Sequence, residues 1–176
     1  MRLSRDPLRD PEPLLRRVYA YVAYRVGDGP VAEDIVGATF ERAVRYRSSY
    51  DQRRGDPIAW LIGIARQCIL DSYSRTAELV LADVPERAAP GDHADETVRR
   101  VALGGAVSSL PERDRELVAL RYGADLSSRR IGELVGMTTN AVEVALHRAL
   151  ERLRGEIGDD RLPLPGPGRA PARDVS

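Results

Sequence analysis

The sequence predicts an all-α protein made of two small helical domains joined by a flexible acidic linker. Apolar residues recur at intervals of three and four along most of the chain, and no stretch of useful length alternates as a β-strand does. Between residues 76 and 96 this periodicity is lost, and prolines and acidic residues accumulate. We therefore expect a first helical domain over residues 11–75, a linker over 76–96, a second domain over 97–154 that carries a helix-turn-helix, and a disordered proline- and glycine-rich tail over 155–176.

Three helices are expected in the first domain. Leucine, valine and tyrosine side chains form one stripe from Pro11 to Val26, and the glycine- and proline-containing turn that follows begins a second helix. This second helix is expected to end near Arg47. Asp56 and Pro57 are an acidic cap and a proline at the first helical position, so a third helix should start there and continue to Arg75.

The second domain is expected to contain four helices. Apolar residues from Val98 toward Ser109 suggest a helix weakened by two glycines, and Pro111 starts another that ends at Gly123. A short helix then ends at Gly136, where glycine allows the chain to leave the helix with a positive φ. In the last helix an apolar stripe is predicted to be buried, and it consists of Val142, Leu146, Ala149 and Leu153.

Polar residues occupy the opposite face of this last helix. Thr138 is placed to cap it, and Thr139 and Asn140 follow in its first turn. In a helix-turn-helix this end enters the major groove. Arg129 and Arg130 stand in the first turn of the preceding helix, where they oppose the helix dipole, so a DNA phosphate is a plausible partner. An ordinary two-helix hairpin with a solvated charged face is the alternative for this segment alone.

Composition argues against several classes of function. The chain has 176 residues, of which 43% are hydrophobic, but its apolar runs are too short to cross a bilayer. The first residues lack the apolar segment of a secretory signal, so we expect a cytoplasmic protein without membrane insertion. The single cysteine, Cys68, excludes an internal disulfide and is expected to be buried. Two distant histidines and one cysteine offer no catalytic or metal-binding arrangement, so we expect no enzymatic activity, cofactor or metal.

Charges are distributed unevenly although the formal net charge of the chain is zero. Residues 41–75 and 98–154 each carry a net charge of +3, whereas residues 76–97 carry −5. Within the first basic block, the loop before the third helix holds Tyr50, Arg53 and Arg54, a composition that suits an unstacked base and its phosphates. This asymmetry is compatible with nucleic-acid binding.

Two blocks of the sequence together resemble the bacterial sigma factors, and among them the small extracytoplasmic-function group that keeps only regions 2 and 4. The segments AEDIVGATFERAVRYRSSYD and DPIAWLIGIARQCILDSYSR resemble region 2. The segment SLPERDRELVALRYGADLSSRRIGELVGMTTNAVEVALHRALERLR resembles region 4. The resemblance covers roughly residues 14–75 and 97–154, in the family's order and on either side of the acidic linker.

This resemblance implies three partners: core RNA polymerase, promoter DNA and an anti-sigma factor. In the family, region 2 docks on the polymerase clamp and melts the minus-ten element, and region 4 reads the minus-thirty-five element as duplex. The implied polymerase contacts are Glu33, Asp34, Ile35, Phe40 and Arg42. The implied minus-ten contacts are Tyr50, Asp51, Arg53, Arg54, Arg66, Gln67, Asp71 and Arg75. The implied minus-thirty-five contacts are Arg129, Arg130, Thr139, Asn140, Glu143, Val144, His147 and Arg148.

The chain departs from the family pattern at two places. Gly37 and Ala38 stand where the polymerase-binding helix commonly has glutamine followed by an acidic residue, which weakens the implied clamp contact. Glu143 replaces the usual basic residue of the recognition helix; it would repel phosphate and can only accept a hydrogen bond from a cytosine amino group. We therefore expect a weak or unusual minus-thirty-five contact.

The resulting hypothesis is an alternative sigma factor that binds core RNA polymerase and directs promoter recognition and melting. A sigma-like decoy that sequesters an anti-sigma factor is a second possibility, prompted by Gly37, Glu143 and the zero net charge. A helix-turn-helix transcriptional regulator is a third, although it would leave the first domain unexplained.

Overall fold

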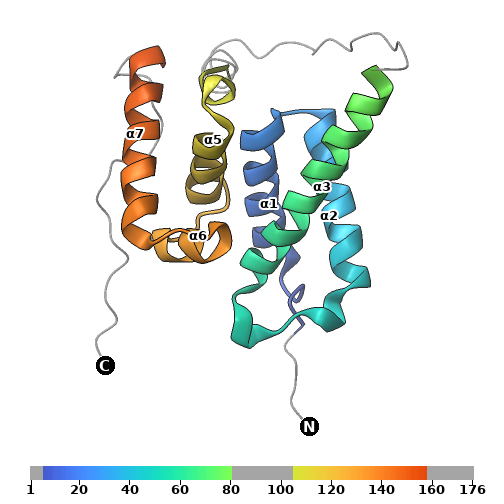
Figure 1. The fold of residues 1–176 in the computed structure, drawn as a ribbon. Helices are drawn as coiled ribbons and strands as arrows, with labels where there is room; N and C mark the ends of the chain where they lie inside the picture. The colour runs from blue at the N-terminus through green and yellow to red at the C-terminus, as the bar shows by residue number, and fades with distance from the viewer. Residues whose placement is uncertain (1–5, 81–104, 158–176) are drawn as a thin grey trace, which may run out of the picture.

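The computed structural model describes residues 6–80 and 105–157, and every regular element within these ranges is helical, as predicted. A first group of helices comprises α1 (Pro11–Val26), α2 (Pro30–Arg45) and α3 (Pro57–Val80). A second group comprises α5 (Glu112–Val118), the π-helical segment η3 (Ala119–Gly123), α6 (Ser128–Val135) and α7 (Thr139–Ile157). The two groups stand side by side, with α1 next to α5 (Figure 1).

In the first group, helix starts agree with the prediction and two helix ends differ. α1 ends at Val26, and its C-cap residue Gly27 has a φ of 90°, which is open to glycine and costly for other residues. α2 ends at Arg45, and the short 3-10 turns η1 (Arg47–Ser49) and η2 (Gln52–Arg54) connect it to α3. α3 continues to Val80 instead of ending at Arg75, because alanine, glutamate and leucine are good helix formers. Residues 76–80 of the predicted linker are therefore helical, and residues 81–96 lie outside the described ranges.

In the second group, the helix-turn-helix is present with the predicted exit at Gly136 and cap at Thr138, and Ser127 provides a cap for α6 that was not predicted. The backbone N–H of Arg130 donates to the Ser127 hydroxyl at 3.3 Å, and Gly136 leaves α6 with a φ of 72°. Ala141 N donates to the Thr138 hydroxyl at 3.2 Å, which caps α7. α7 continues to Ile157, past the predicted end at Arg154, and the Glu156 carboxylate accepts a hydrogen bond of 2.6 Å from the Ser109 hydroxyl. The rest of the predicted tail, and the first part of the helix expected from Val98, lie outside the described residues.

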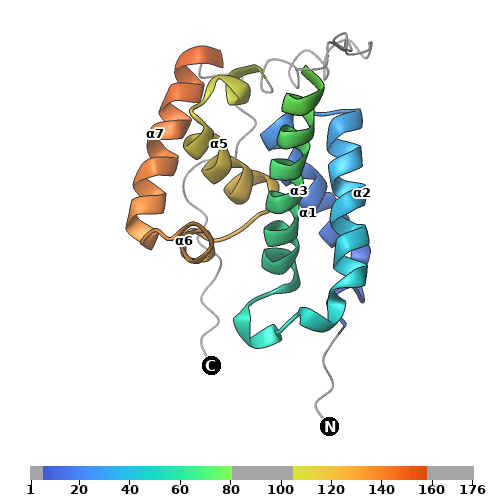
Figure 2. The ribbon, with the colours of Figure 1, turned by 45° about the vertical axis from the view of Figure 1, so that its right-hand side comes forward.

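A single hydrophobic cluster runs through both groups of helices. It includes Val18, Leu61 and Ile62 from the first group and Leu120 and Leu153 from the second, each fully buried. The predicted stripe of α7 is buried, and Cys68 is buried on α3. α1 contacts η3 and α5, and α3 contacts α6, so the two groups pack against each other over several elements (Figure 2). The core is therefore shared between the two predicted domains.

Candidate nucleic-acid interface

The most continuous polar surface among the predicted site residues lies along α7. All six of its predicted residues are exposed, and they are Thr139, Asn140, Glu143, Val144, His147 and Arg148. Their spacing of three and four places them on the face opposite the buried stripe. Within the described residues, Arg148 and Asn140 have no side-chain partner, whereas the His147 Nε2 atom lies 3.3 Å from a Glu151 carboxylate oxygen. This face therefore offers donors, acceptors and one exposed valine to a ligand.

The two arginines at the start of α6 are both paired with carboxylates. Arg129 Nε lies 3.2 Å from Glu133 Oε1, and Arg130 Nη1 donates to Glu133 Oε2. The hydrogen bonds from Arg130 hold the pKa of Glu133 below its usual value. Arg129 is well exposed, but the side chain of Arg130 is only 27% exposed because it lies against the loop before α3, where Arg130 Nη2 is 3.9 Å from Asp56 Oδ2.

In the loop between α2 and α3, the two predicted arginines are exposed, and the other two predicted residues are engaged within the loop. Arg53 and Arg54 lie at the surface. Arg53 Nε also lies 3.2 Å from Asp51 Oδ1. Asp51 caps the η2 turn, and the backbone N–H of Arg53, with its side chain, lowers the pKa of the Asp51 carboxyl. Tyr50 is 7% exposed, its hydroxyl donates to the Gly55 carbonyl at 3.0 Å, and its ring packs against Trp60 with centroids 5.5 Å apart. In this arrangement Tyr50 shapes the loop and its ring is not available for stacking on a base.

The predicted polymerase and minus-ten contacts meet at an ion pair between α2 and α3. Arg42 Nη2 donates to Asp71 Oδ2 at 2.6 Å, and Gln67 donates to Asp71 Oδ1 at 3.0 Å. The hydrogen bonds from Gln67 and Arg42 lower the pKa of Asp71. Arg75 is exposed one turn further along α3. This ion pair links the two predicted contact surfaces.

On α2, the predicted polymerase contacts divide into surface and core residues. Glu33 and Asp34 are exposed. Ile35 is 3% exposed and belongs to the hydrophobic cluster, and Phe40 is half-buried against it. Ile35 therefore holds α2 in place and presents no surface to a partner in this arrangement, because its position follows the apolar stripe of the helix.

A charged network between the two groups of helices was not anticipated from the sequence. The Glu116 carboxylate on α5 accepts hydrogen bonds from the Tyr21 hydroxyl at 3.1 Å, and it lies 2.7 Å from Arg25 Nε and 3.0 Å from Arg66 Nε. Burial and the neighbouring Glu116 charge raise the pKa of Tyr21. The sequence feature that could have indicated this network is the spacing of Arg17, Tyr21 and Arg25, which places three polar side chains on one face of α1.

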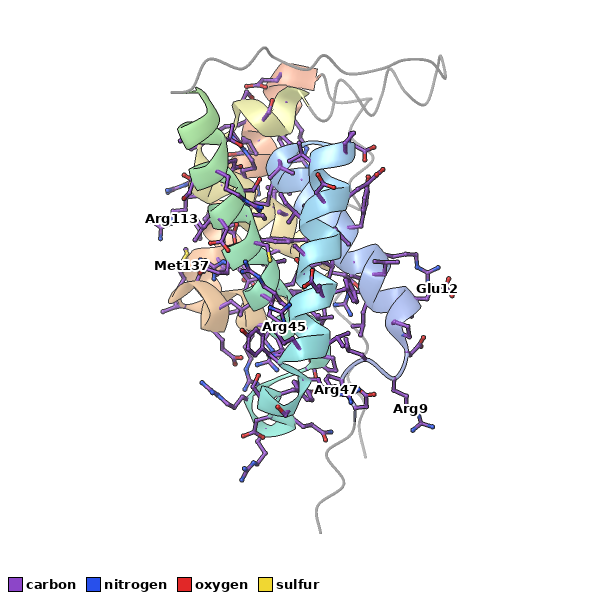
Figure 3. The ribbon with its side chains drawn as sticks, turned by 90° about the vertical axis from the view of Figure 1, so that its right-hand side faces the viewer. Arg9, Glu12, Arg45, Arg47, Arg113 and Met137 are labelled. Atoms are coloured by element: carbon purple, nitrogen blue, oxygen red, sulfur yellow. The ribbon has the colours of Figure 1, made fainter. Side chains whose placement is uncertain are left out.

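Two grooves border this contact between the groups. One of about 550 Å³ is lined by residues of α1, α3 and α5, together with Val135 at the end of α6 and Met137 from the turn before α7. Arg113 and Met137, which both line this groove, lie along the same edge of the molecule in Figure 3. The second groove, of about 760 Å³, lies between the start of α3 and the start of α6 and includes Arg17, Arg129 and Arg130. Acidic and basic side chains line both grooves, so neither is a uniformly charged channel.

The described residues contain no group of three or more histidine, cysteine, aspartate or glutamate side chains arranged to hold a metal ion. None of the helices in these ranges has the length and apolar character needed to cross a membrane.

Comparison with known proteins identifies two matching families. Residues 12–78 match the family described as Sigma-70 region 2, and residues 100–153 match Sigma-70, region 4. The chain is 32% identical over 151 residues to the ECF RNA polymerase sigma factor BldN of Streptomyces coelicolor, covering 81% of this chain and 57% of BldN. It is 32% identical over 152 residues to the RNA polymerase sigma factor CarQ of Myxococcus xanthus, covering 81% of this chain and 84% of CarQ. The chain thus spans 57% of the length of BldN and most of CarQ.

A similar fold occurs in the co-crystal structure of the sigma factor RpoE in complex with the anti-sigma factor NepR from Bartonella quintana. The TM-score is 0.65 at 20% sequence identity, and the alignment covers 85% of this chain and 95% of the other. At this identity the likeness establishes the shared fold. The helical architecture of the two groups is thus shared with this solved structure.

Proposed function

Because the chain belongs to the extracytoplasmic-function group of the sigma-70 family, we propose that it is an alternative sigma factor that binds core RNA polymerase and directs promoter recognition and melting. The observation that carries the proposal is the exposed polar face of α7, which is joined through a capped turn to the short helix α6. Two helices in this arrangement dock on duplex DNA, with the start of the second helix in the major groove.

For the minus-thirty-five element, we assign base contacts to the start and middle of α7. Arg148 is the strongest candidate, because a guanidinium group can donate two hydrogen bonds to a guanine edge. Asn140 suits an adenine edge, and the exposed Val144 suits a thymine methyl group. The Glu143 carboxylate can only accept hydrogen bonds, so it favours contact with a cytosine amino group and disfavours contact with a phosphate. Arg129, exposed at the start of α6, is assigned to a backbone phosphate.

For the minus-ten element, we assign the single strand to the loop before α3 and to the polar half of α3. Arg53 and Arg54 are the exposed cations of the loop, and Gln67 and Arg75 are exposed on the helix. A cationic surface of this kind follows a single-stranded backbone, and unstacked bases need an apolar or aromatic surface nearby. Trp60, which is half-buried beside Tyr50, provides that surface if the loop rearranges on binding.

For the polymerase, we assign the contact to the exposed acidic start of α2, where Glu33 and Asp34 lie. Arg42 is paired with Asp71, so it supports this surface through the α2–α3 ion pair. An anti-sigma factor is a further expected partner, in line with the complex formed by the structurally similar RpoE. The proposed role requires no catalytic residue, cofactor or metal of this chain, and its place of action is the cytoplasm.

The decoy is the alternative supported by one observation, the exposed Glu143 in the middle of the predicted reading face. A decoy would bind an anti-sigma factor tightly and core polymerase not at all. These two measurements separate it from a working sigma factor.

Transcription from fragmented genomic DNA tests the proposed function directly. Purified core polymerase is supplied with this chain or with none, and the 5′ ends of the RNA products are mapped. We expect new clustered start sites that share two upstream sequence elements about 25 base pairs apart, or about 85 Å along B-DNA. Absence of new starts, together with absence of a polymerase complex in a binding assay, would refute the proposal and leave the decoy.

A further inference from the structure

We propose that Asp71 is a positioning residue for base selection. It fixes the side-chain amide of Gln67 so that the Oε1 atom is left for the minus-ten strand, and this oxygen selects a base with an exocyclic amino group, which is cytosine or adenine. The inference rests on the proposed function, because it uses the assignment of the polar half of α3 to the single strand.

Asp71 is held by donors on both of its oxygens. Arg42 Nη2 on α2 donates to Asp71 Oδ2 at 2.6 Å, and Gln67 Nε2, one turn earlier on α3, donates to Asp71 Oδ1 at 3.0 Å. Hydrogen bonds from Gln67 and Arg42 lower the pKa of the Asp71 carboxyl, so the group is ionised at neutral pH. An ionised carboxylate can only accept hydrogen bonds. The end of the Gln67 amide that faces Asp71 must therefore be its NH₂ group.

This contact decides which end of the Gln67 amide remains for a ligand. A glutamine amide has an oxygen on one side and an NH₂ group on the other, and half a turn of the amide exchanges them. A glutamine side chain without partners can therefore pair with bases of either kind. Gln67 is exposed, its Nε2 atom is tied to Asp71, and among the described residues no donor reaches its Oε1 atom. The available end is thus an acceptor.

An acceptor at this position distinguishes bases by one functional group. Cytosine and adenine carry an amino group where thymine and guanine carry a carbonyl oxygen. The amino group donates to Gln67 Oε1, whereas a carbonyl oxygen facing Oε1 leaves both oxygens without a donor. Stacking adds no comparable choice, because every base has a π-face. The hydrogen bond to Gln67 therefore carries the selection.

A cation for the strand backbone stands beside this acceptor. Arg75 is exposed one turn beyond Asp71, and its Nε atom donates to the Asp71 backbone carbonyl at 3.4 Å. Gln67, Asp71 and Arg75 are spaced by four residues, so they lie along one side of α3. Phosphate contacts position a nucleic acid, and base contacts specify its sequence. The stripe thus places a positioning group and a selecting group next to each other.

Replacing Asp71 with asparagine should reverse the selection. The Arg42 guanidinium only donates, so the oxygen of the new amide faces Arg42 and its NH₂ group faces Gln67. Gln67 then turns its Oε1 atom toward this NH₂ group and presents its own NH₂ group to the strand, which favours a carbonyl-bearing base. A merely structural defect would weaken binding to all bases alike. Reversal of the preference is therefore specific to a positioning role.

The first test uses the free full-length chain and two single-stranded oligonucleotides, oligo(dC) and oligo(dU). Uracil has a carbonyl oxygen where cytosine has its amino group, and neither base carries a methyl group. Fluorescence anisotropy at neutral pH should show that the wild-type chain binds oligo(dC) about tenfold more tightly than oligo(dU). Asp71→Asn should prefer oligo(dU), and Gln67→Ala should bind both equally.

Asp10→Asn, at an exposed position before α1, is the matched control and should keep the wild-type preference. Circular dichroism confirms that each variant retains its helices. Equal binding of both oligonucleotides by the wild-type chain would overturn the selection by Gln67. An Asp71→Asn chain with the wild-type preference would overturn the positioning role of Asp71.

The second test uses the chain bound to core polymerase. In a promoter obtained by start-site mapping, each nontemplate position of the minus-ten element is randomised and the transcripts are sequenced. We expect one position where wild type prefers adenine or cytosine and Asp71→Asn prefers guanine or thymine. An unchanged preference at every position would overturn the inference. Failure of the wild-type chain to direct any new start refutes the proposed sigma function separately, because the oligonucleotide preference is measured without polymerase.

Discussion

The residues predicted to read the minus-thirty-five element differ in whether their side chains are already paired with other groups of the chain. Arg148 is exposed on α7 and has no ion-pair partner among the described residues, whereas Arg130 is held by Glu133 and lies against the loop before α3. Free groups can engage DNA without first breaking an internal bond. Arg148 is therefore the residue whose loss should affect promoter binding most directly.

Replacing Arg148 with alanine should reduce transcription from promoters that depend on the minus-thirty-five element by about tenfold or more. A bidentate contact with a guanine is worth about 1–3 kcal/mol of discrimination, and about 1.4 kcal/mol corresponds to a tenfold change. The readout is run-off transcription with core polymerase. Gly155→Ala, further along α7 where an added Cβ atom meets nothing within 4 Å, is the control expected to retain activity. Equal output from Arg148→Ala and wild type would contradict the assignment.

The Asp71 carboxylate should make the free energy of unfolding depend on pH in the acidic range. Hydrogen bonds from Gln67 and Arg42 lower its pKa in the folded chain. A lowered pKa means that the unfolded chain binds the proton more readily, so the stabilisation is fully present above about pH 4 and is lost as the pH falls through the folded pKa. Asp71→Asn should flatten this part of the acid dependence, measured by urea unfolding between neutral pH and pH 3. The exposed Asp34→Asn variant should follow wild type.

At the scale of single helices, the helix-turn-helix depends on one close approach within the second group. A Cβ atom added to Gly132 in α6 would lie 2.4 Å from the Met137 carbonyl oxygen, in the turn that leads to α7. The same two residues are joined by a hydrogen bond of 2.9 Å from Met137 N to the Gly132 carbonyl. The angle between α6 and α7 is therefore set by glycine at this position.

Gly132→Ala should destabilise the chain by about 1–3 kcal/mol, because the turn must move to admit the methyl group. Chemical denaturation followed by circular dichroism measures this. Gly63→Ala on α3 is the matched control; it meets nothing within 4 Å and should be neutral or stabilising by up to about 1 kcal/mol, since alanine favours the helix. A Gly132→Ala chain as stable as Gly63→Ala would show that the turn adapts freely.

Helix boundaries in this protein follow local signals more closely at starts than at ends. Pro11, Pro30 and Pro57 each begin a helix where the sequence predicted one, because proline favours the first helical position. The end of α3 was predicted five residues too early, since residues 76–80 carry no stop signal and only the change in composition suggested a boundary. α7 extends past Arg154 because the Glu156 contact with Ser109, a residue remote in sequence, supports its last turn.

For the molecule as a whole, the shared core makes the two predicted domains energetically dependent on each other. The hydrophobic cluster is continuous from Val18 in α1 to Leu153 in α7. A substitution that removes packing at one end of the cluster is therefore expected to destabilise the other end as well. The chain should unfold in one cooperative transition.

Leu153→Ala should lower the free energy of unfolding by about 2–5 kcal/mol, because it leaves a cavity at a fully buried position. Thermal unfolding followed by calorimetry and by the fluorescence of Trp60 in the first group measures whether both groups respond. Val44→Ala, at a position 57% exposed, is the control expected to change stability little. Loss of the second group's signal alone, with Trp60 unaffected, would show that the two groups unfold independently.

The sequence by itself determined the features that depend on local chemistry. Apolar spacing, helix-starting prolines and Gly136 indicated the all-α fold, and the order of two motif blocks indicated the sigma-factor family. The exposed face of α7 followed from the same periodicity, since residues opposite a buried stripe must face outward.

Only the tertiary structure decided which charged groups meet. Tyr21 and Glu116 are 95 residues apart, and no local pattern pairs them. Tertiary packing also buries Tyr50 and Ile35, although the sequence suggested a binding role for both. Ion pairs and burial depend on how separate helices approach one another, and that approach is set by close contacts such as Gly123 against α1, which periodicity within one helix does not encode.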